Sequence, residues 1–144
     1  MNPSFIVVEG LEGAGKSSVI ELIRAFLVAK GHDVECTREP GGTPMSSVAY
    51  QGGGRGIDIS VLNTLRKMTL GSFEPDFVLY LDVEPSVGLV RARGRGELDR
   101  IELSGLSFFE NARRTYKKLV QDSSKAVEID AMQAMDVVHS DVSA

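Results

Sequence analysis

The sequence contains little cysteine and histidine, and it has no long apolar stretch. Among its 144 residues there are one Cys, two His and no Trp. Cys36 therefore cannot form an intramolecular disulfide, which fits a reducing compartment. The longest uninterrupted apolar runs, Ala25–Ala29 and Phe77–Leu81, have five residues, far fewer than the ~20 that a membrane-spanning helix needs. No apolar leader of signal-peptide length precedes the first strand-like segment, so we expect a cytoplasmic protein with no membrane partner.

Positive charge is also scarce. There are 16 Lys and Arg against 20 Asp and Glu, which gives a net charge of −4, and the aromatic residues are only six Phe and three Tyr. An acidic chain with few aromatic side chains is not expected to bind a nucleic acid polymer. With 42% hydrophobic and 25% charged residues, the composition is typical of one soluble globular domain, which we expect to span residues 1–144.

Strand-like and helix-like patterns alternate along the chain. Strands are expected at residues 5–8, 34–37, 77–83 and 127–129, and helices near 19–27, 59–70, 86–90 and 109–120, with a weak helix after the last strand. Cys36 would lie in the core on the second strand. The four glycines of Gly52–Gly56 predict a loop that is mobile or approaches a ligand. The alternation indicates an α/β fold with a mainly parallel sheet flanked by helices.

One motif carries chemistry. Residues Gly10–Ser17 match G-x-x-x-x-G-K-[ST] and lie between an expected strand and an expected helix. Glycines let backbone N–H groups turn inward around an anion, and the N-terminus of the following helix favours negative charge. A glycine-rich turn with no function would not require the lysine and the hydroxyl. The motif therefore predicts binding of a nucleoside triphosphate, with Lys16 on the β- and γ-phosphates and Ser17 on Mg²⁺. The expected nucleotide contacts are Gly10, Leu11, Glu12, Gly13, Ala14, Gly15, Lys16, Ser17 and Ser18.

Four separated strings resemble the bacterial thymidylate kinases. They are V-V-E-G-L-E-G-A-G-K-S-S from Val7, T-R-E-P-G-G-T from Thr37, A-Y-Q-G from Ala49 and L-Y-L-D-V from Leu79. The resemblance implies a three-layer P-loop NTPase fold with an arginine-rich lid. It also implies transfer of the γ-phosphoryl group of MgATP to dTMP, giving dTDP and ADP in dTTP biosynthesis, by a homodimer.

The lid is expected at about 91–102, where the resemblance implies that Arg91, Arg93 and Arg95 approach the phosphates. Phosphoryl transfer needs cations that neutralise the charge spreading over the phosphoryl oxygens. The phosphate loop offers no cation before Lys16, so Arg95 is the favoured catalytic arginine. The alternative is that these arginines pair with nearby acidic residues on a solvated helix end.

The acceptor site is assigned by resemblance alone. Glu12 would approach the sugar 3′-hydroxyl, Ser47 and Tyr50 would contact thymine and deoxyribose, and Arg38 and Gln51 would lie nearby. A tyrosine beside the sugar could exclude a 2′-hydroxyl. The structural alternatives are a solvent-facing carboxylate for Glu12, aromatic packing for Tyr50 and a surface ion pair for Arg38.

The chain departs from the family between Met45 and Ser46. There the family carries a long segment with helices and a strand that ends in an Asp-Arg pair, which would supply an acid near magnesium and an arginine for the acceptor phosphate. In the family, the missing strand would run between the first and second strands. Without it, each buried backbone group left without a hydrogen-bond partner would cost ~1–3 kcal/mol of stability. We therefore hypothesise that these 144 residues are an incomplete version of a longer protein. An intact mass near 15.6 kDa for the native protein would contradict this.

Three functions remain open at this stage. The first is an active dTMP kinase whose full-length form contains the absent segment. The second is a shortened, catalytically inactive module that binds ATP. The third is a related nucleoside or nucleotide kinase with another acceptor, which the T-R-E-P-G-G-T and A-Y-Q-G strings disfavour.

Overall fold

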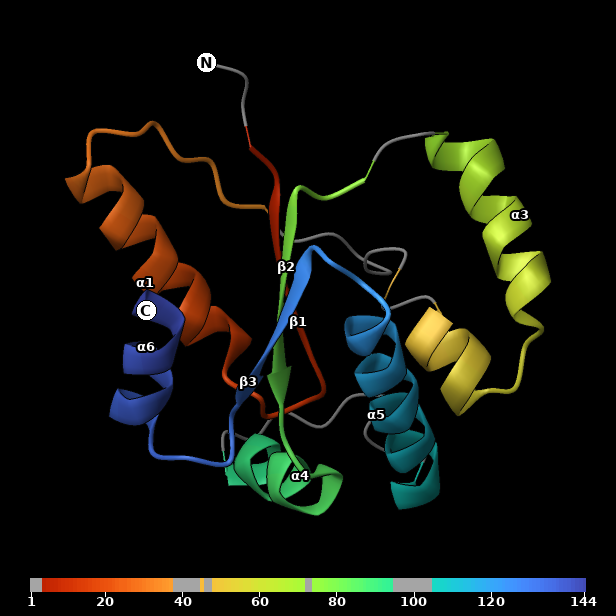
Figure 1. The fold of residues 1–144 in the computed structure, drawn as a ribbon. Helices are drawn as coiled ribbons and strands as arrows, with labels where there is room; N and C mark the ends of the chain where they lie inside the picture. The colour runs from red at the N-terminus through yellow and green to blue at the C-terminus, as the bar shows by residue number, and fades with distance from the viewer. Residues whose placement is uncertain (1–3, 38–44, 46–47, 72–73, 95–104) are drawn as a thin grey trace.

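A computed structural model describes residues 4–37, 45, 48–71, 74–94 and 105–144. The described strands and helices alternate along most of the chain (Figure 1). In chain order they are β1 (Ile6–Gly10), α1 (Lys16–Ala29), the π-helix η1 (Val48–Gly54), α3 (Ile59–Leu70), β2 (Phe77–Asp82), α4 (Pro85–Gly94), α5 (Leu106–Gln121), β3 (Ala126–Asp130) and α6 (Met135–Ser143).

The three described strands form a parallel sheet in the order β1-β2-β3. In the β1–β2 ladder, Glu9 lies opposite Tyr80 and Gly10 opposite Leu81. Every residue of β2 after Phe77 is buried, as expected of a central parallel strand with helices on both faces. The strands predicted at 5–8, 77–83 and 127–129 are thus confirmed, with shifts of one or two residues at their ends.

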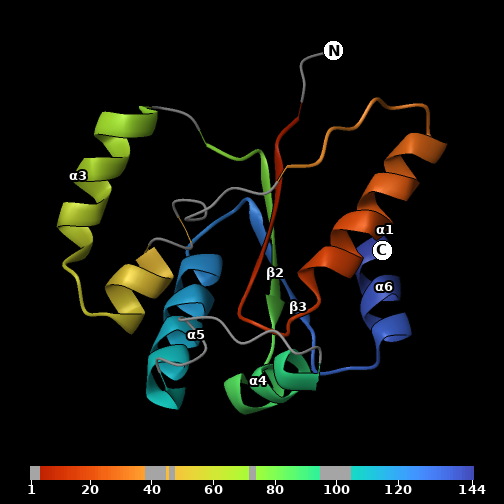
Figure 2. The ribbon, with the colours of Figure 1, turned by 180° about the vertical axis from the view of Figure 1, so that it is seen from behind.

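Helices cover both faces of the sheet, so the predicted three-layer α/β architecture is confirmed. Figures 1 and 2 show α1 and α6 together on one face, α5 and η1 on the other, and α4 beyond the C-terminal ends of the strands. The core runs through all three layers because the elements contribute apolar side chains at strand or helix spacing. Its largest fully buried side chains are Tyr80, Tyr116, Phe109, Leu11, Leu81, Val19 and Val83.

The prediction of a strand at residues 34–37 was wrong. These residues form no strand in the structure, and Cys36 is exposed rather than part of the core. Among the described residues, β1 forms a ladder with β2 alone. A strand exists only where a neighbour takes its hydrogen bonds, and no described strand lies on the far side of β1. Val34–Thr37 therefore has β-forming residues but no partner among the described strands.

The prediction of an irregular loop at Gly52–Gly56 was also wrong in part, because the first three of these glycines end η1. The reason is close packing against α5. A Cβ on Gly53 would overlap the side chain of Thr115, and one on Gly54 would overlap the ring of Phe108. The glycines therefore let two helices approach closely rather than freeing a loop. Only Gly56, with φ of 75°, has the left-handed conformation expected of a turn.

The helix α3 stands apart from the core. None of its described side chains is buried, and Val61, Leu65 and Met68 are 50%, 52% and 78% exposed. Within the described part of the chain, no helix has the length and apolar character needed to cross a membrane.

Gly88 of α4 marks the tightest contact between a helix and the loop that follows β1. A Cβ on Gly88 would overlap the carbonyl oxygen of Glu12, and one on Gly13 would overlap the carbonyl of Gly88. Both obstacles are backbone atoms, which cannot move aside by changing rotamer.

We predict that Gly88→Ala destabilises the protein although alanine is the better helix former. The gain in helix propensity is about 1 kcal/mol, whereas overpacking against backbone costs about 1–3 kcal/mol or more. The melting temperature should fall by a few degrees and the affinity for nucleotide should fall with it. Ser86→Ala, an exposed position of the same helix, is the control and should leave both unchanged. Equal melting temperatures for Gly88→Ala and the parent would show that the loop is not packed in this way.

Candidate active site

The phosphate loop leaves β1 at Gly10 and enters α1 at Lys16. Gly13 and Gly15 have φ values of 77° and 89°, which only glycine adopts at little cost. Between them and β1, Leu11 and Ala14 are 1% and 3% exposed, so their side chains anchor the loop in the core. Leu11 and Ala14 therefore hold the loop to the core, and the left-handed glycines set the course of its backbone.

Lys16 lies at the first turn of α1 with its ammonium folded back over the loop. Its Nζ donates a hydrogen bond of 2.6 Å to the carbonyl oxygen of Gly10. Ser17 and Ser18 follow on the exposed side of the helix N-terminus. Backbone amides, a helix N-terminus, an ammonium and a hydroxyl together form the donor set that a magnesium-bound polyphosphate requires. No cluster of three acidic, His or Cys side chains that could hold a metal by itself exists in the described parts of the chain, so the metal would need oxygens of the nucleotide as ligands.

Directly below this loop, Glu9 is buried at 5% exposure in the apolar strand β1. The hydroxyl of Tyr116 donates to its Oε2 at 2.9 Å. Burial raises the pKa of Glu9 from 4.5 to about 7, against the opposing effects of the Tyr116 hydrogen bond and the charge of Lys16. Burial, and then the charge of Glu9, raise the pKa of Tyr116 well above its ordinary value. The pKa of Glu9 is thus near neutral pH, and the positive charge of Lys16 lowers it against the effect of burial.

Tyr116 also contacts the residue expected to bind the acceptor. Its ring stacks on Tyr80 with centroids 4.9 Å apart, and it meets the ring of Tyr50 edge-on at 6.1 Å. Tyr50 contacts Phe108 as well, at 5.9 Å. Tyr50 and Gln51 are half-buried in η1. The described structure therefore surrounds Tyr50 with aromatic rings and links it through Tyr116 to Glu9.

A second polar network lies at the C-terminal end of β2. Arg113 of α5 donates two hydrogen bonds of 2.9 Å to the carboxylate of Asp82. The ammonium of Lys117 lies 3.2 Å from the same carboxylate, and the hydroxyl of Tyr80 donates to this carboxylate at 3.0 Å. Burial alone would raise the pKa of Asp82, but the hydrogen bonds from Arg113, Lys117 and Tyr80 outweigh it and keep the pKa below its ordinary value. This network ties α5 to the sheet.

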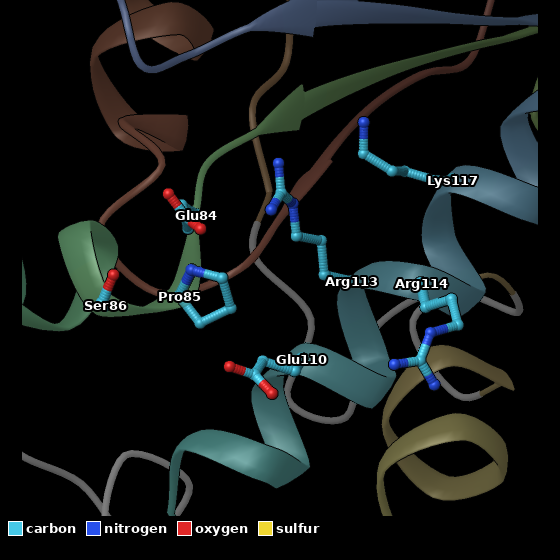
Figure 3. Close-up of a pocket in the computed structure, with 7 residues that line it drawn as sticks. All are labelled: Glu84, Pro85, Ser86, Glu110, Arg113, Arg114 and Lys117. Carbon is cyan, nitrogen blue, oxygen red and sulfur yellow. The ribbon is translucent and has the colours of Figure 1, made fainter.

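A charged groove of about 350 Å³ lies next to this network, between the start of α4 and α5. Figure 3 shows Arg113 and Lys117 extending from α5 toward the end of β2. Because Asp82 already pairs with both cations, the groove offers a ligand less positive charge than its residues suggest.

The other predicted site residues are distributed as follows. Arg91 lies in α4 and donates to the carbonyl oxygen of Ala131 at 2.8 Å, which ties α4 to the chain after β3. Glu12 is half-buried in the phosphate loop. Arg38, Ser47, Arg95 and the side chain of Arg93 lie outside the described parts of the chain, as does most of the predicted lid at 91–102.

Sequence reasoning singled out neither Glu9 nor Arg113. A carboxylate within an otherwise apolar strand, immediately before a phosphate-loop motif, is a visible signal for Glu9. Nothing comparable marks Arg113, because its partner is 31 residues away and only the packing of α5 on β2 brings the two together.

A parallel sheet whose first strand leads through such a loop into a helix defines a phosphate-loop nucleotide-binding protein. The family model described as thymidylate kinase matches residues 8–45 and 44–142, and the chain belongs to the thymidylate kinase family. It is similar to the thymidylate kinase of Alteromonas mediterranea (strain DSM 17117 / CIP 110805 / LMG 28347 / Deep ecotype), with 42% identity over an alignment that covers 99% of this chain and 88% of that protein.

The same comparisons bear on the break at Met45. The family model matches in two pieces that meet at residues 44–45. The alignment with the Alteromonas protein spans 196 positions, at least 196 − 144 = 52 more than this chain has residues. This chain is therefore short of a segment that its relative contains, as the resemblance indicated.

We predict that Glu9→Gln stabilises the protein in a pH-dependent way. Between pH 4.5 and about 7 the folded state binds more protons at Glu9 than the unfolded state does, so stability falls as pH rises through this window. Above it the ionised carboxylate costs the folded state up to about 3 kcal/mol. Glutamine keeps an acceptor for Tyr116 and removes this cost.

Urea unfolding at about pH 5 and pH 8 measures the effect. The variant should be more stable than the parent at the higher pH, and most of the difference should be absent at the lower one. Asp82 does not interfere, because its lowered pKa changes stability only as pH falls below about its ordinary value of 3.8. A difference of the same size at both pH values would contradict the assignment.

Proposed function

We propose that this chain is a dTMP kinase that holds MgATP in the Gly10–Ser18 loop and transfers its γ-phosphoryl group to dTMP, forming dTDP and ADP for dTTP biosynthesis. The observation that carries the proposal is the loop itself, with two left-handed glycines and the Lys16 ammonium at the N-terminus of α1. The alternatives, an inactive ATP-binding module and a related nucleoside or nucleotide kinase with another acceptor, are not favoured by the family to which the chain belongs.

The loop residues would perform the electrostatic part of the reaction. Backbone N–H groups from Gly13 to Ser18 would bind the phosphates, and Lys16 would leave the carbonyl of Gly10 to neutralise the oxygens between which the phosphoryl group moves. The hydroxyl of Ser17 would be the protein's ligand to Mg²⁺, which supplies a further positive charge when bound. Such a reaction needs alignment and charge more than covalent chemistry.

The acceptor would bind on the η1 side of the loop. Tyr50 supports this proposal because its ring packs on Phe108 and on Tyr116, whose hydroxyl donates to Glu9 just before the phosphate loop. By resemblance, Glu12, Arg38, Ser47 and Gln51 would bind the nucleotide with it. An Asp-Arg pair of the family is absent here, so the affinity for dTMP is expected to be lower than in relatives that contain the missing segment.

The lid would supply the remaining positive charge. We assign the catalytic role to Arg95, assisted by Arg93, by resemblance and because the phosphate loop has no cation before Lys16. Arg91 is the weaker candidate, since its guanidinium already serves the carbonyl of Ala131 in this structure.

We propose, further, that the enzyme is a cytoplasmic homodimer. The exposed apolar residues Val61, Leu65 and Met68 of α3 support a contact with a second copy, and the family resemblance implies the same assembly.

We predict that Lys16→Ala lowers the rate of dTDP formation at least ~100-fold, the loss typical of removing one group that stabilises transition-state charge. A coupled assay of ADP release, with and without dTMP, measures the reaction. ADP release that depends on dTMP supports the kinase, whereas ATP binding without such release would identify the inactive binding module.

Lys30→Ala is the matched control, because Lys30 follows the other end of the same helix and lies over the exposed ring of Phe26. This variant should retain the parent's activity. Unchanged dTDP formation in the folded Lys16→Ala variant would overturn the assignment of the loop.

A further inference from the structure

Glu9 has no part in the proposed reaction, yet the fold buries it beside the phosphate loop. A carboxyl group in an apolar strand is costly unless it is paired, and here it accepts a hydrogen bond from Tyr116 and lies within the influence of Lys16. Its ladder partner, Tyr80, directs its hydroxyl to Asp82 and not to Glu9. Among the described residues, Tyr116 from α5 and Lys16 from α1 act on the charge of Glu9.

Lys16 acts on both of the last two residues of β1. In this structure its ammonium bonds to Gly10, the residue directly after Glu9, and its charge favours the ionised form of Glu9. A polyphosphate in the loop would draw the ammonium away and bring several negative charges close to the carboxylate. Both changes make the ionised carboxylate less favourable.

We propose that Glu9, held by Tyr116, is a positioning residue for the loop lysine: its carboxylate balances Lys16 while the loop is empty and takes up a proton from solvent when a nucleotide polyphosphate engages Lys16. This inference rests on the proposed function only in its use of the loop as the nucleotide site. The proton adds to a Glu9 oxygen, and the buffer supplies it.

Calorimetric titration with MgATP, without dTMP, tests the proposal. Titrations at about pH 7.5 in two buffers with different enthalpies of ionisation give the number of protons taken up per nucleotide bound, near the pH at which Glu9 can change its charge. The parent should take up a fraction of a proton more than Glu9→Gln, and the comparison removes any contribution from the nucleotide's own phosphates.

Two tyrosine variants provide a matched pair. Tyr116→Phe removes the hydroxyl that stabilises the ionised Glu9, so Glu9 should already hold its proton before nucleotide arrives and the uptake should decrease. Tyr80→Phe removes an equally buried hydroxyl that serves Asp82 instead and should leave the uptake unchanged. These variants keep the test available should Glu9→Gln fail to fold.

The outcomes separate the two proposals. MgATP binding with the same proton uptake in Glu9→Gln as in the parent, or equal uptake in the two tyrosine variants, would overturn the role of Glu9 and leave the kinase assignment standing. A folded parent that shows no affinity for MgATP would overturn both.

Discussion

The parallel ladder between β1 and β2 is the interaction on which the rest of the site depends. Its register places Glu9 opposite Tyr80 and Gly10 opposite Leu81, so that β1 delivers the chain to the phosphate loop directly beside the end of β2. From there Leu11 and Ala14 turn into the core, Gly13 fits under Gly88 and α1 starts at Lys16. A slip of one residue would turn each side chain of β1 to the opposite face, which would take Glu9 away from Tyr116 and remove the anchor of the loop.

Two carboxylates at neighbouring strand ends show how surroundings assign different roles to similar groups. Asp82 receives two hydrogen bonds from Arg113 and more from Lys117 and Tyr80, and its pKa is lowered, so it stays charged and holds α5 to the sheet. Glu9, with the same exposed fraction of 5%, accepts a hydrogen bond from the neutral hydroxyl of Tyr116, and burial raises its pKa to about 7. The first group is fixed in charge. Glu9 can change its charge when the neighbouring charge of Lys16 moves, so its protonation can respond to a phosphate bound in the loop.

The phosphate loop was predictable from the sequence because the motif, the strand before it and the helix after it are all local. The same is true of α1, α5 and β2, whose apolar spacing is strong. Contacts that join distant segments could not be read in this way: the pairing of Arg113 with Asp82 and the bond from Tyr116 to Glu9, 107 residues apart, depend on how α5 lies on the sheet. The glycines of η1 were misinterpreted for the same reason, since the closeness of α5, and not a turn, explains Gly53 and Gly54.

Residues Val34–Thr37 show that β-forming side chains do not make a strand unless a neighbouring strand can pair with them. Its sequence is no less suited to a strand than that of β3, which is also largely exposed, yet only β3 has a described neighbour to pair with. The family resemblance implies that a strand able to pair with both β1 and Val34–Thr37 belongs to the segment absent here, and the family match is split at residues 44–45. On that assignment, the loss of one strand removes two from the sheet, because the outer strand would depend on the inner one for its hydrogen bonds. The donor half of the site survives this loss because β1 takes its support from β2, α1 and α4. By the family resemblance, the acceptor half lacks that independence, because its arginine and acid would lie on the same absent strand.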